Sequence, residues 1–262
     1  RDKVDVISLG KGYQNPHNVP AKPSFMAKMQ NADVFIRIGM DLDIWSNLLL
    51  DGCRNDRIYK NAPGNIDASK GCEILEIPTT KIDKSQGDIH IYGNPHYWLD
   101  PMNGMKMMDN ICKGFSKIDP EDAKYFNANK ELYEKEIKTS LQGWLKQMEP
   151  YKGRKIVTYH KSWPNFAKRF GLDVVGYIEP KPGVPPTAND IANLISVMKE
   201  EHAKVIIMEP YFSDQVPNLV AEKTGATVLI LPPSVGGAEG VNTYIDLFNY
   251  NIGKLVAVFK KS

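Results

Sequence analysis

Short apolar runs alternate with helical patterns throughout the second half of this chain, and that alternation restricts the possible folds more than any other feature. Strands are predicted over residues 155–159, 174–178, 205–208 and 228–231. Helices are predicted up to residue 170, over 188–201, near 216–223 and from about 242. Strands that alternate with helices are typical of a parallel sheet covered by helices. We therefore predict an α/β fold.

The first half of the chain shows the same alternation less regularly. Strands are predicted over residues 4–9, 33–39 and 73–77, and helices over 25–31 and 42–50. A Gly-Lys-Gly turn follows the first of these strands, as in dinucleotide-binding loops. The third position of that fingerprint is Asn15 rather than glycine, so we reject the dinucleotide interpretation.

A long helix is predicted between the two halves. Asp119 is a good N-cap, Pro120 fits the first helical position, and acidic residues follow in the first turn. An apolar stripe continues to about Met148, a length of about 40 Å at 1.5 Å per residue. We interpret this helix as a strut along both halves. The expected organisation is an N-terminal α/β lobe over residues 1–118, a linking helix over 119–150 and a C-terminal α/β lobe over 151–262.

Composition and charge argue against several classes of protein. The 262 residues are 42% hydrophobic, which is typical of an ordinary soluble globular protein. The 33 lysines and arginines nearly balance 31 acidic residues, so a net charge of +2 gives no reason to expect a nucleic-acid partner. No apolar run reaches the roughly 18 residues of a membrane-spanning helix. The chain begins at Arg1 without a signal peptide, so we expect that any export leader has been removed.

The three cysteines show no metal-binding or redox spacing. Cys53 and Cys72 both lie in loop-like sequence and can pair in an oxidising compartment, the alternative being two free thiols. Cys112 is expected to be buried in a helix.

Three histidines stand in strand-to-helix turns: His17, His96 and His160. His96 lies in the stretch Gly-Asn-Pro-His-Tyr-Trp-Leu-Asp-Pro, between two prolines and before a helix start. Ligands of open parallel sheets bind outside the carboxyl ends of the strands. Neutral imidazoles that converge there from both halves suit zinc, and tolerate manganese or other first-row ions. For the stretch that carries His96, the alternative is a buried aromatic turn whose imidazole satisfies a backbone group.

Two carboxylates and two further histidines are weaker candidates. Glu179 and Glu209 stand at strand ends, where either can complete a tetrahedral set. His90 lies six residues before His96 in a polar loop. His202, at the end of a charged helix, is expected to be a solvated surface residue.

The chain also resembles a known family. The segments that carry the resemblance occur in the family's order and are NPHNVPAKPSFM with DVFIRIG, GNPHYWLDP, VTYHKSWPNFAKRFGL, EPKPGVPPTANDIANLI, MEPYFSD and GGAEGVNTYIDLFNYNI. They are similar to the zinc and manganese substrate-binding proteins of ABC transporters, the TroA-like or ZnuA-like family. The resemblance implies two α/β lobes joined by one long rigid helix, with a metal in the cleft between them. It places the family's ligand histidines on His17, His96 and His160.

Two departures from the family pattern bear on the site. A strand and a helix usually precede the segment matched by residues 4–9 and are absent here, so the N-terminal lobe is expected to lack a strand. The family often supplies an aspartate ligand where this chain has Pro232. Because sequential parallel strands usually lie side by side, we predict Glu209, at the end of the preceding strand, as the fourth ligand. Glu179 and water are the alternatives.

The function implied by the resemblance is capture of a divalent transition metal, without any reaction. Zinc is the expected ion and manganese the alternative. The expected partner is an ABC transporter permease in the membrane, and the protein is expected to be a monomer with a periplasmic or extracytoplasmic location, free or lipid-anchored. Two other functions stay open: a zinc-dependent hydrolase, in which Glu209 acts as a base on a zinc-bound water, and a surface adhesin.

Overall fold

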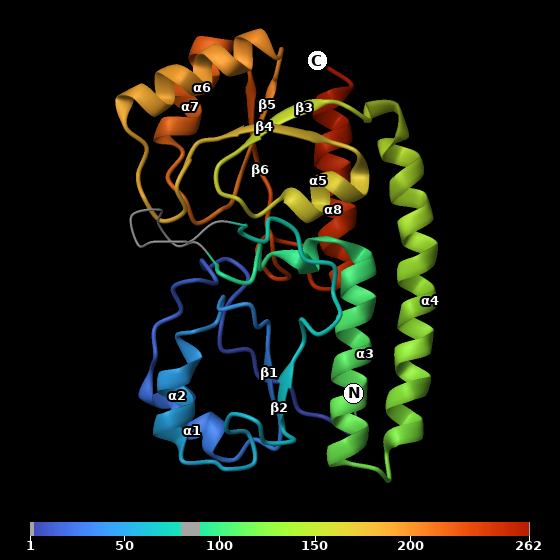
Figure 1. The fold of residues 1–262 in the computed structure, drawn as a ribbon. Helices are drawn as coiled ribbons and strands as arrows, with labels where there is room; N and C mark the ends of the chain where they lie inside the picture. Colours follow the sequence, from blue (N-terminus) through green and yellow to red (C-terminus); the bar gives the residue numbers. More distant parts are fainter. Residues whose placement is uncertain (1–2, 80–89, 262) are drawn as a thin grey trace.

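The structure, a computed structural model, describes residues 3–79 and 90–261. Two lobes lie one above the other in Figure 1, the N-terminal lobe in blue and the C-terminal lobe in yellow and orange. Helix α4, Ala123–Met148, runs beside both of them. The arrangement confirms an α/β fold of two lobes connected by a long helix.

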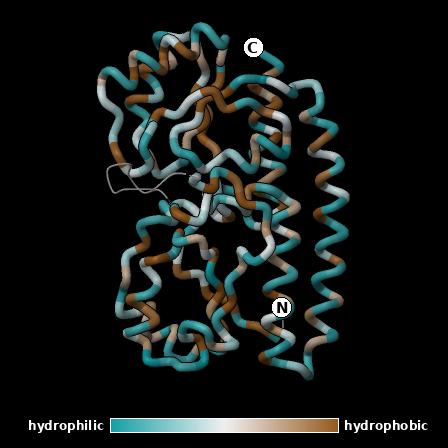
Figure 2. Tube along the Cα trace, in the orientation of Figure 1, coloured by the Kyte–Doolittle hydropathy of each residue, from teal (hydrophilic) through white to brown (hydrophobic). Residues whose placement is uncertain are grey.

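The C-terminal lobe is built on a parallel sheet with the strand order β4-β3-β5-β6. Its strands are β3 Lys155–Thr158, β4 Asp173–Tyr177, β5 Val205–Met208 and β6 Thr227–Ile230. Each agrees with its prediction to within one residue at either end. Every residue of β5 is buried, as expected for an inner strand of a parallel sheet covered on both faces. Figure 2 shows the hydrophobic residues concentrated on these strands.

Helices accompany the strands of this lobe in the predicted order. They are α5 Pro164–Phe170, α6 Ala188–Glu200, α7 Gln215–Thr224 and α8 Tyr244–Phe259. A capping box begins both α6 and α8, where a threonine N-cap and an aspartate three residues later exchange hydrogen bonds. None of the described helices is long and apolar enough to cross a membrane.

The N-terminal lobe contains a smaller sheet. Strand β1, Phe35–Arg37, pairs in parallel with β2, Asn65–Asp67, and helices α1 Pro23–Gln30 and α2 Ser46–Cys53 belong to the same lobe. The predicted strands over residues 4–9 and 73–77 are wrong, and the three-residue β2 has no counterpart among the predictions. A strand forms only where a neighbouring segment provides ladder hydrogen bonds. Within the described residues, neither of these two segments forms a ladder of hydrogen bonds with a neighbour, and Leu75 accepts only a single backbone hydrogen bond, from Asn94.

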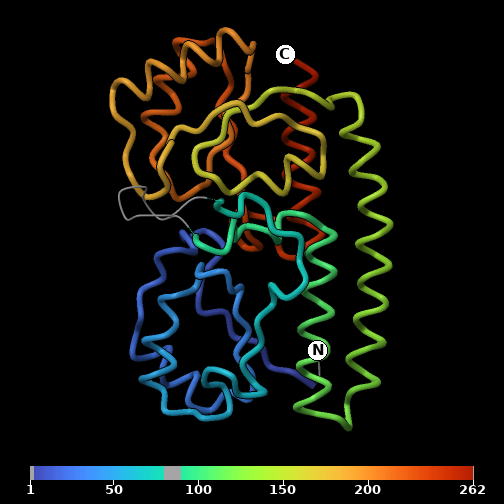
Figure 3. Tube along the Cα trace, viewed as in Figure 1, coloured from blue at the N-terminus to red at the C-terminus, as the bar shows by residue number. Residues whose placement is uncertain are grey.

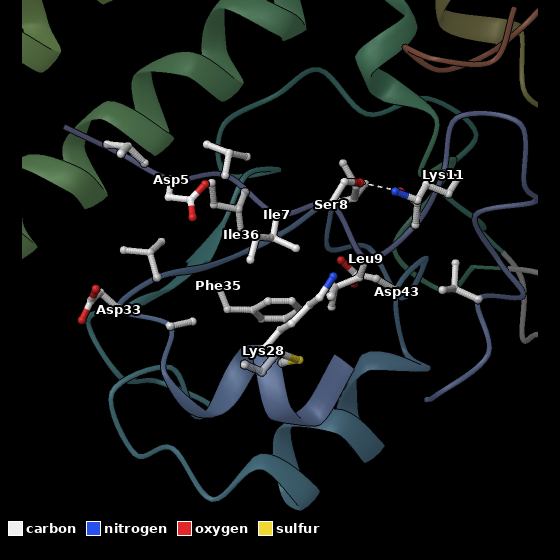
Figure 4. A pocket seen from close by; sticks show the side chains of 18 of the residues that line it. Asp5, Ile7, Ser8, Leu9, Lys11, Lys28, Asp33, Phe35, Ile36 and Asp43 are labelled. Atoms are coloured by element: carbon white, nitrogen blue, oxygen red, sulfur yellow. Dashed lines mark hydrogen bonds between the residues drawn. The ribbon is translucent and has the colours of Figure 1, made fainter. Parts of the chain in front are cut away.

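The segment Val4–Leu9 instead borders a cavity of about 1070 Å³ (Figure 4). Ile7 from this segment and Phe35 and Ile36 from β1 contribute to its lining. The side chains of Val6 and Ile7 are 78% and 51% exposed. The apolar pattern of a strand is therefore present, but these side chains are not packed in a sheet. The cavity lining includes none of the three candidate ligand histidines.

The linking helix begins three residues later than predicted. The Asp119 carboxylate accepts a hydrogen bond from the backbone N–H of Asp122 at 3.2 Å and closes a turn ahead of α4, which starts at Ala123. The helix ends at Met148, as predicted, and continues into the short 3-10 helix η3, Glu149–Tyr151. Helix α3, Pro101–Ile118, lies beside the N-terminal half of α4 (Figure 3).

Buried contacts join the two lobes. Trp98 and Leu99 of the N-terminal lobe pack in one hydrophobic cluster with residues of β3 and α8. The Trp98 indole N–H donates to the carbonyl of Pro233 at 2.7 Å. The Asp100 carboxylate accepts two hydrogen bonds from the Arg169 guanidinium, both at 2.7 Å. The segment that follows His96 is therefore fixed against the C-terminal lobe.

All three cysteines are free, so the predicted Cys53–Cys72 disulfide is wrong. The thiol of Cys53 donates to the carbonyl of Leu50 within α2, and that of Cys72 lies 3.8 Å from the carbonyl of Asn103. The two side chains thus occupy separate packing environments. Burial raises the pKa of the Cys72 thiol to about 11, which disfavours the reactive thiolate. Cys112 is buried in α3, as expected.

Candidate metal site

Two of the three predicted ligands are positioned by the same local turn. The chain carries Asn-Pro-His twice, at residues 15–17 and 94–96. In each copy the side-chain oxygen of the asparagine accepts a hydrogen bond from the backbone N–H of the histidine, at 3.0 Å for His17 and 2.9 Å for His96. Asparagine readily closes such a turn with the backbone two residues on. The repeat is visible in the sequence, but the hydrogen bonds explain why the asparagine is needed.

The third histidine is positioned by the C-terminal sheet. His160 comes two residues after the end of β3, at the carboxyl edge of the sheet, where ligands of such folds bind. The Thr158 hydroxyl donates to the carbonyl of His160 at 2.8 Å and fixes the turn.

The rings of His17, His96 and His160 converge between the lobes. One donor nitrogen of each histidine lies within 4.8 Å of a donor nitrogen of the other two. Among the described residues, this is the only group of three or more potential metal ligands at such spacing. Nε2 of His17 lies 3.2 Å from Nε2 of His96. The ring centres are 5.1, 5.2 and 5.4 Å apart. With zinc–nitrogen bonds of about 2.1 Å, neighbouring nitrogens of a tetrahedral site lie about 3.4 Å apart and ring centres about 5.2 Å apart. The observed spacings match these dimensions.

Asn94 determines which ring nitrogen of His96 faces the other histidines. Its amide nitrogen donates to Oε2 of Glu76 at 2.8 Å and to the carbonyl of Lys161 at 2.7 Å. Its amide oxygen therefore faces Nδ1 of His96 at 3.0 Å and can only accept, so Nδ1 carries the proton. The lone pair is left on Nε2, which is the nitrogen beside His17. The sequence places Asn94 in the turn before His96 but does not indicate its contact with the histidine ring.

Glu179 has the same effect on His160. Its carboxylate accepts a hydrogen bond from Nδ1 of His160 at 2.7 Å, and both side chains are buried. A carboxylate behind a metal-ligating imidazole fixes the ring and raises its basicity. In this position the Glu179 carboxylate holds the ring of His160 through Nδ1.

Burial favours the neutral form of two of these imidazoles, those of His17 and His96. His96 and His160 are only 2% and 6% exposed. Burial, reinforced by the neighbouring His160, lowers the pKa of His17 to about 3. Burial also lowers the pKa of His96 well below its ordinary value. A neutral imidazole is the form that binds a metal ion.

The other sequence candidates do not join this group. Glu209 is fully buried, and its Oε1 accepts a hydrogen bond from the Trp163 indole at 3.1 Å. Burial raises the pKa of Glu209. His90 is half-buried, with its ring centre 5.0 Å from that of His17. His202 lies exposed on the surface, as predicted.

Comparison with known proteins gives a consistent assignment. The family described as zinc-uptake complex component A, periplasmic, matches residues 1–258. The high-affinity zinc uptake system protein ZnuA of Bacillus subtilis (strain 168) is 25% identical over 260 residues, which cover 97% of this chain and 81% of that protein. The zinc-binding protein AdcA of Streptococcus pyogenes serotype M1 is 25% identical over 243 residues, 90% of this chain and 47% of that protein. The chain thus spans about half the length of this streptococcal relative.

A solved structure has the same fold. A manganese-bound mutant of the periplasmic metal binding protein from Candidatus Liberibacter asiaticus superimposes with a TM-score of 0.80 at 24% identity, covering 98% of this chain and 92% of that one. The family match leaves only the last few residues of the chain uncovered. The chain therefore belongs to the family of the periplasmic zinc-uptake complex component A.

Proposed function

We propose that this protein captures a divalent transition metal ion outside the cytoplasmic membrane and delivers it to the permease of an ABC transporter. The observation that carries the proposal is the convergence of three imidazole nitrogens from both lobes. Relatives described as zinc uptake and zinc-binding proteins support this kind of cargo. The ligands we propose are His17, His96 and His160.

Zinc is the cargo that the donor atoms favour. Imidazole nitrogen suits zinc, whereas manganese prefers oxygen ligands. Manganese is the alternative, since a similar structure holds that ion. For the fourth ligand, the sequence-based expectation is Glu209, which lies close enough to His160 for a charge on that imidazole to affect its pKa.

We propose a monomer that works in the periplasm or an equivalent extracytoplasmic space, free or lipid-anchored, without nucleic acid. The family's description places its members in the periplasm and in an uptake complex. The permease partner is proposed on that basis.

Elemental analysis of protein purified without added metal is the direct test of the cargo. We expect one zinc per chain. In calorimetric titrations, His96→Ala and His160→Ala should each weaken zinc binding by about a hundredfold or more, because each variant loses a nitrogen ligand of the ion. His202→Ala is the matched control, since this exposed histidine lies outside the site. Zinc binding by either site variant with the parent's affinity would refute the assignment.

The alternative functions predict different results. A zinc hydrolase would turn over generic ester, peptide or phosphate substrates when loaded with zinc. The near-complete burial of His96 and His160 argues for a holding site rather than a substrate-accessible one. An adhesin would bind surfaces in an assay with or without metal. We expect no turnover, and no surface binding in either condition.

A further inference from the structure

Three nitrogen ligands leave one corner of a tetrahedral zinc site to be filled. We propose that His90 fills it, so that four imidazoles hold the ion. This inference rests on the metal-binding function proposed above.

The spacing between the rings of His90 and His17 supports this assignment. The ring centre of His90 lies 5.0 Å from that of His17, with 35° between the ring planes. His17 lies 5.1 Å from His96 and 5.2 Å from His160 by the same measure. Imidazoles that share a tetrahedral zinc ion have ring centres about 5.2 Å apart. His90 therefore stands at ligand spacing from one member of the group.

The backbone of His90 is tied to the segment that carries His96. The carbonyl of His90 accepts a hydrogen bond from the N–H of Gly93 at 3.1 Å. Gly93 has φ +104°, a conformation that glycine adopts without strain. The next residue, Asn94, donates its N–H to the carbonyl of Leu75 at 2.8 Å. The turn from His90 to Gly93 is thus anchored directly ahead of the Asn-Pro-His motif.

His90 is not part of the group whose donor nitrogens lie within 4.8 Å of one another. Its coordination to the same ion therefore requires its side chain to move towards the other three imidazoles.

Two described carboxylates near the group accept hydrogen bonds, although among the described residues Oε2 of Glu209 has no hydrogen-bond partner. Glu179 accepts from Nδ1 of His160, and Glu209 accepts from the Trp163 indole. Pro232, where the family often supplies an aspartate, has no donor side chain, and its carbonyl accepts from Asn251. Coordination by His90 leaves the hydrogen bonds of Glu179 and Glu209 in place.

A set of four imidazoles has a consequence for selectivity. Manganese prefers oxygen ligands, and four neutral nitrogens offer it none. We therefore assign His90 a role in discriminating zinc from manganese as well as in affinity.

X-ray absorption spectroscopy of the zinc-loaded full chain counts the imidazoles directly. We expect four in the parent protein, and three with one oxygen in both His90→Ala and His90→Phe. The Phe variant keeps an aromatic ring against His17 but has no nitrogen donor, so it separates coordination from packing. In chelator competition, both variants should bind zinc at least about tenfold more weakly and prefer zinc over manganese less strongly. His202→Ala is the control and should match the parent.

Two results would overturn the inference in distinguishable ways. Tight zinc binding by the parent with only three imidazoles, and unchanged affinity in His90→Phe, would reject His90 and leave the proposed function standing. A large loss in Glu209→Gln under those conditions would assign the fourth corner to that carboxylate. Failure of the parent protein to bind zinc or manganese at all would reject the proposed function and the inference together.

Discussion

At the scale of single residues, each asparagine of the two Asn-Pro-His motifs closes the turn that presents its histidine. Asn15 does so through a single hydrogen bond from the backbone of His17. Asn94 makes the same bond, and its amide also contacts the ring of His96 and the backbone of Lys161 in the other lobe. One amide therefore fixes which ring nitrogen of His96 carries the proton and links this histidine to the C-terminal lobe.

The difference between the asparagines can be measured. Asn94→Ala should weaken zinc binding by about 10- to 100-fold, the usual cost of removing the group that orients a metal-ligating imidazole. Asn15→Ala should weaken zinc binding less, because Asn15 bonds to the backbone of His17 and not to its ring. Chelator competition on the folded variants compares them. Equal losses of zinc affinity would mean that the turn, rather than the contact between Asn94 and the ring of His96, determines how tightly zinc binds.

The buried histidines also predict how stability depends on pH. His17 has a pKa of about 3 in the folded protein and an ordinary value of 6.5 in the unfolded chain, and the pKa of His96 is lowered in the same direction. Between those values the unfolded chain binds more protons, so acid stabilises the unfolded state. The metal-free protein should therefore lose stability as the pH falls from about 6.5 towards 3.

Thermal unfolding after chelator treatment, followed from about pH 7.5 to about pH 4.5, tests this dependence. The melting temperature of His17→Asn should fall less steeply than that of the parent, because the substituted side chain does not titrate. Identical slopes would show that other groups control the acid response.

At the scale of elements, the linking helix carries one weak position. Gly143 lies exposed in the interior of α4, and a Cβ added there would meet nothing within 4 Å. Gly153, just after η3, is equally open but has φ +76°. The two glycines differ only in backbone conformation, which makes them a matched pair.

Gly143→Ala should raise the free energy of unfolding by about 0.5–1 kcal/mol, because alanine restricts the unfolded chain and favours the helix. Gly153→Ala should lower it, because an L side chain is strained at that φ. Denaturant titrations measure both, and zinc affinity should stay unchanged in each. A destabilised Gly143→Ala would mean that α4 needs flexibility at this point.

At the scale of the whole molecule, the lobes are joined by more than the linking helix. Trp98 packs in a hydrophobic cluster with residues of the C-terminal lobe, and its indole N–H donates to the carbonyl of Pro233. The Arg169 guanidinium donates two hydrogen bonds to the Asp100 carboxylate. Trp144 of α4 stacks on Phe248 of α8 with 5.0 Å between ring centres. A hinge between the lobes would have to break these buried contacts.

We therefore expect only a small rearrangement when metal is released. Crystal structures of zinc-loaded and metal-free protein, supported by small-angle scattering, should agree in the relative orientation of the lobes. The ion would then leave through local movement around the histidines. A rotation of tens of degrees, as in hinge closure around a ligand, would contradict this expectation.

The sequence by itself determined the α/β class, the C-terminal strands and the three converging histidines. Strands such as Val205–Met208 are continuous apolar runs bounded by turn residues, so their position depends on local patterns. His17 and His96 follow Asn-Pro turns, and His160 follows β3. Local patterns mark all three as turn residues, and the packing of the two lobes brings these turns together.

Only the tertiary structure decided which neighbours each segment meets. The apolar segment Val4–Leu9 is not a strand, because a strand needs a partner that no local pattern provides. Cys53 and Cys72 remain apart for the same reason: pairing depends on distance in space rather than on spacing in the chain. The bond between Glu179 and His160 joins residues 19 apart, and that between Asn94 and Lys161 joins residues 67 apart. Such contacts arise from packing between elements, so single-sequence patterns carry no direct trace of them.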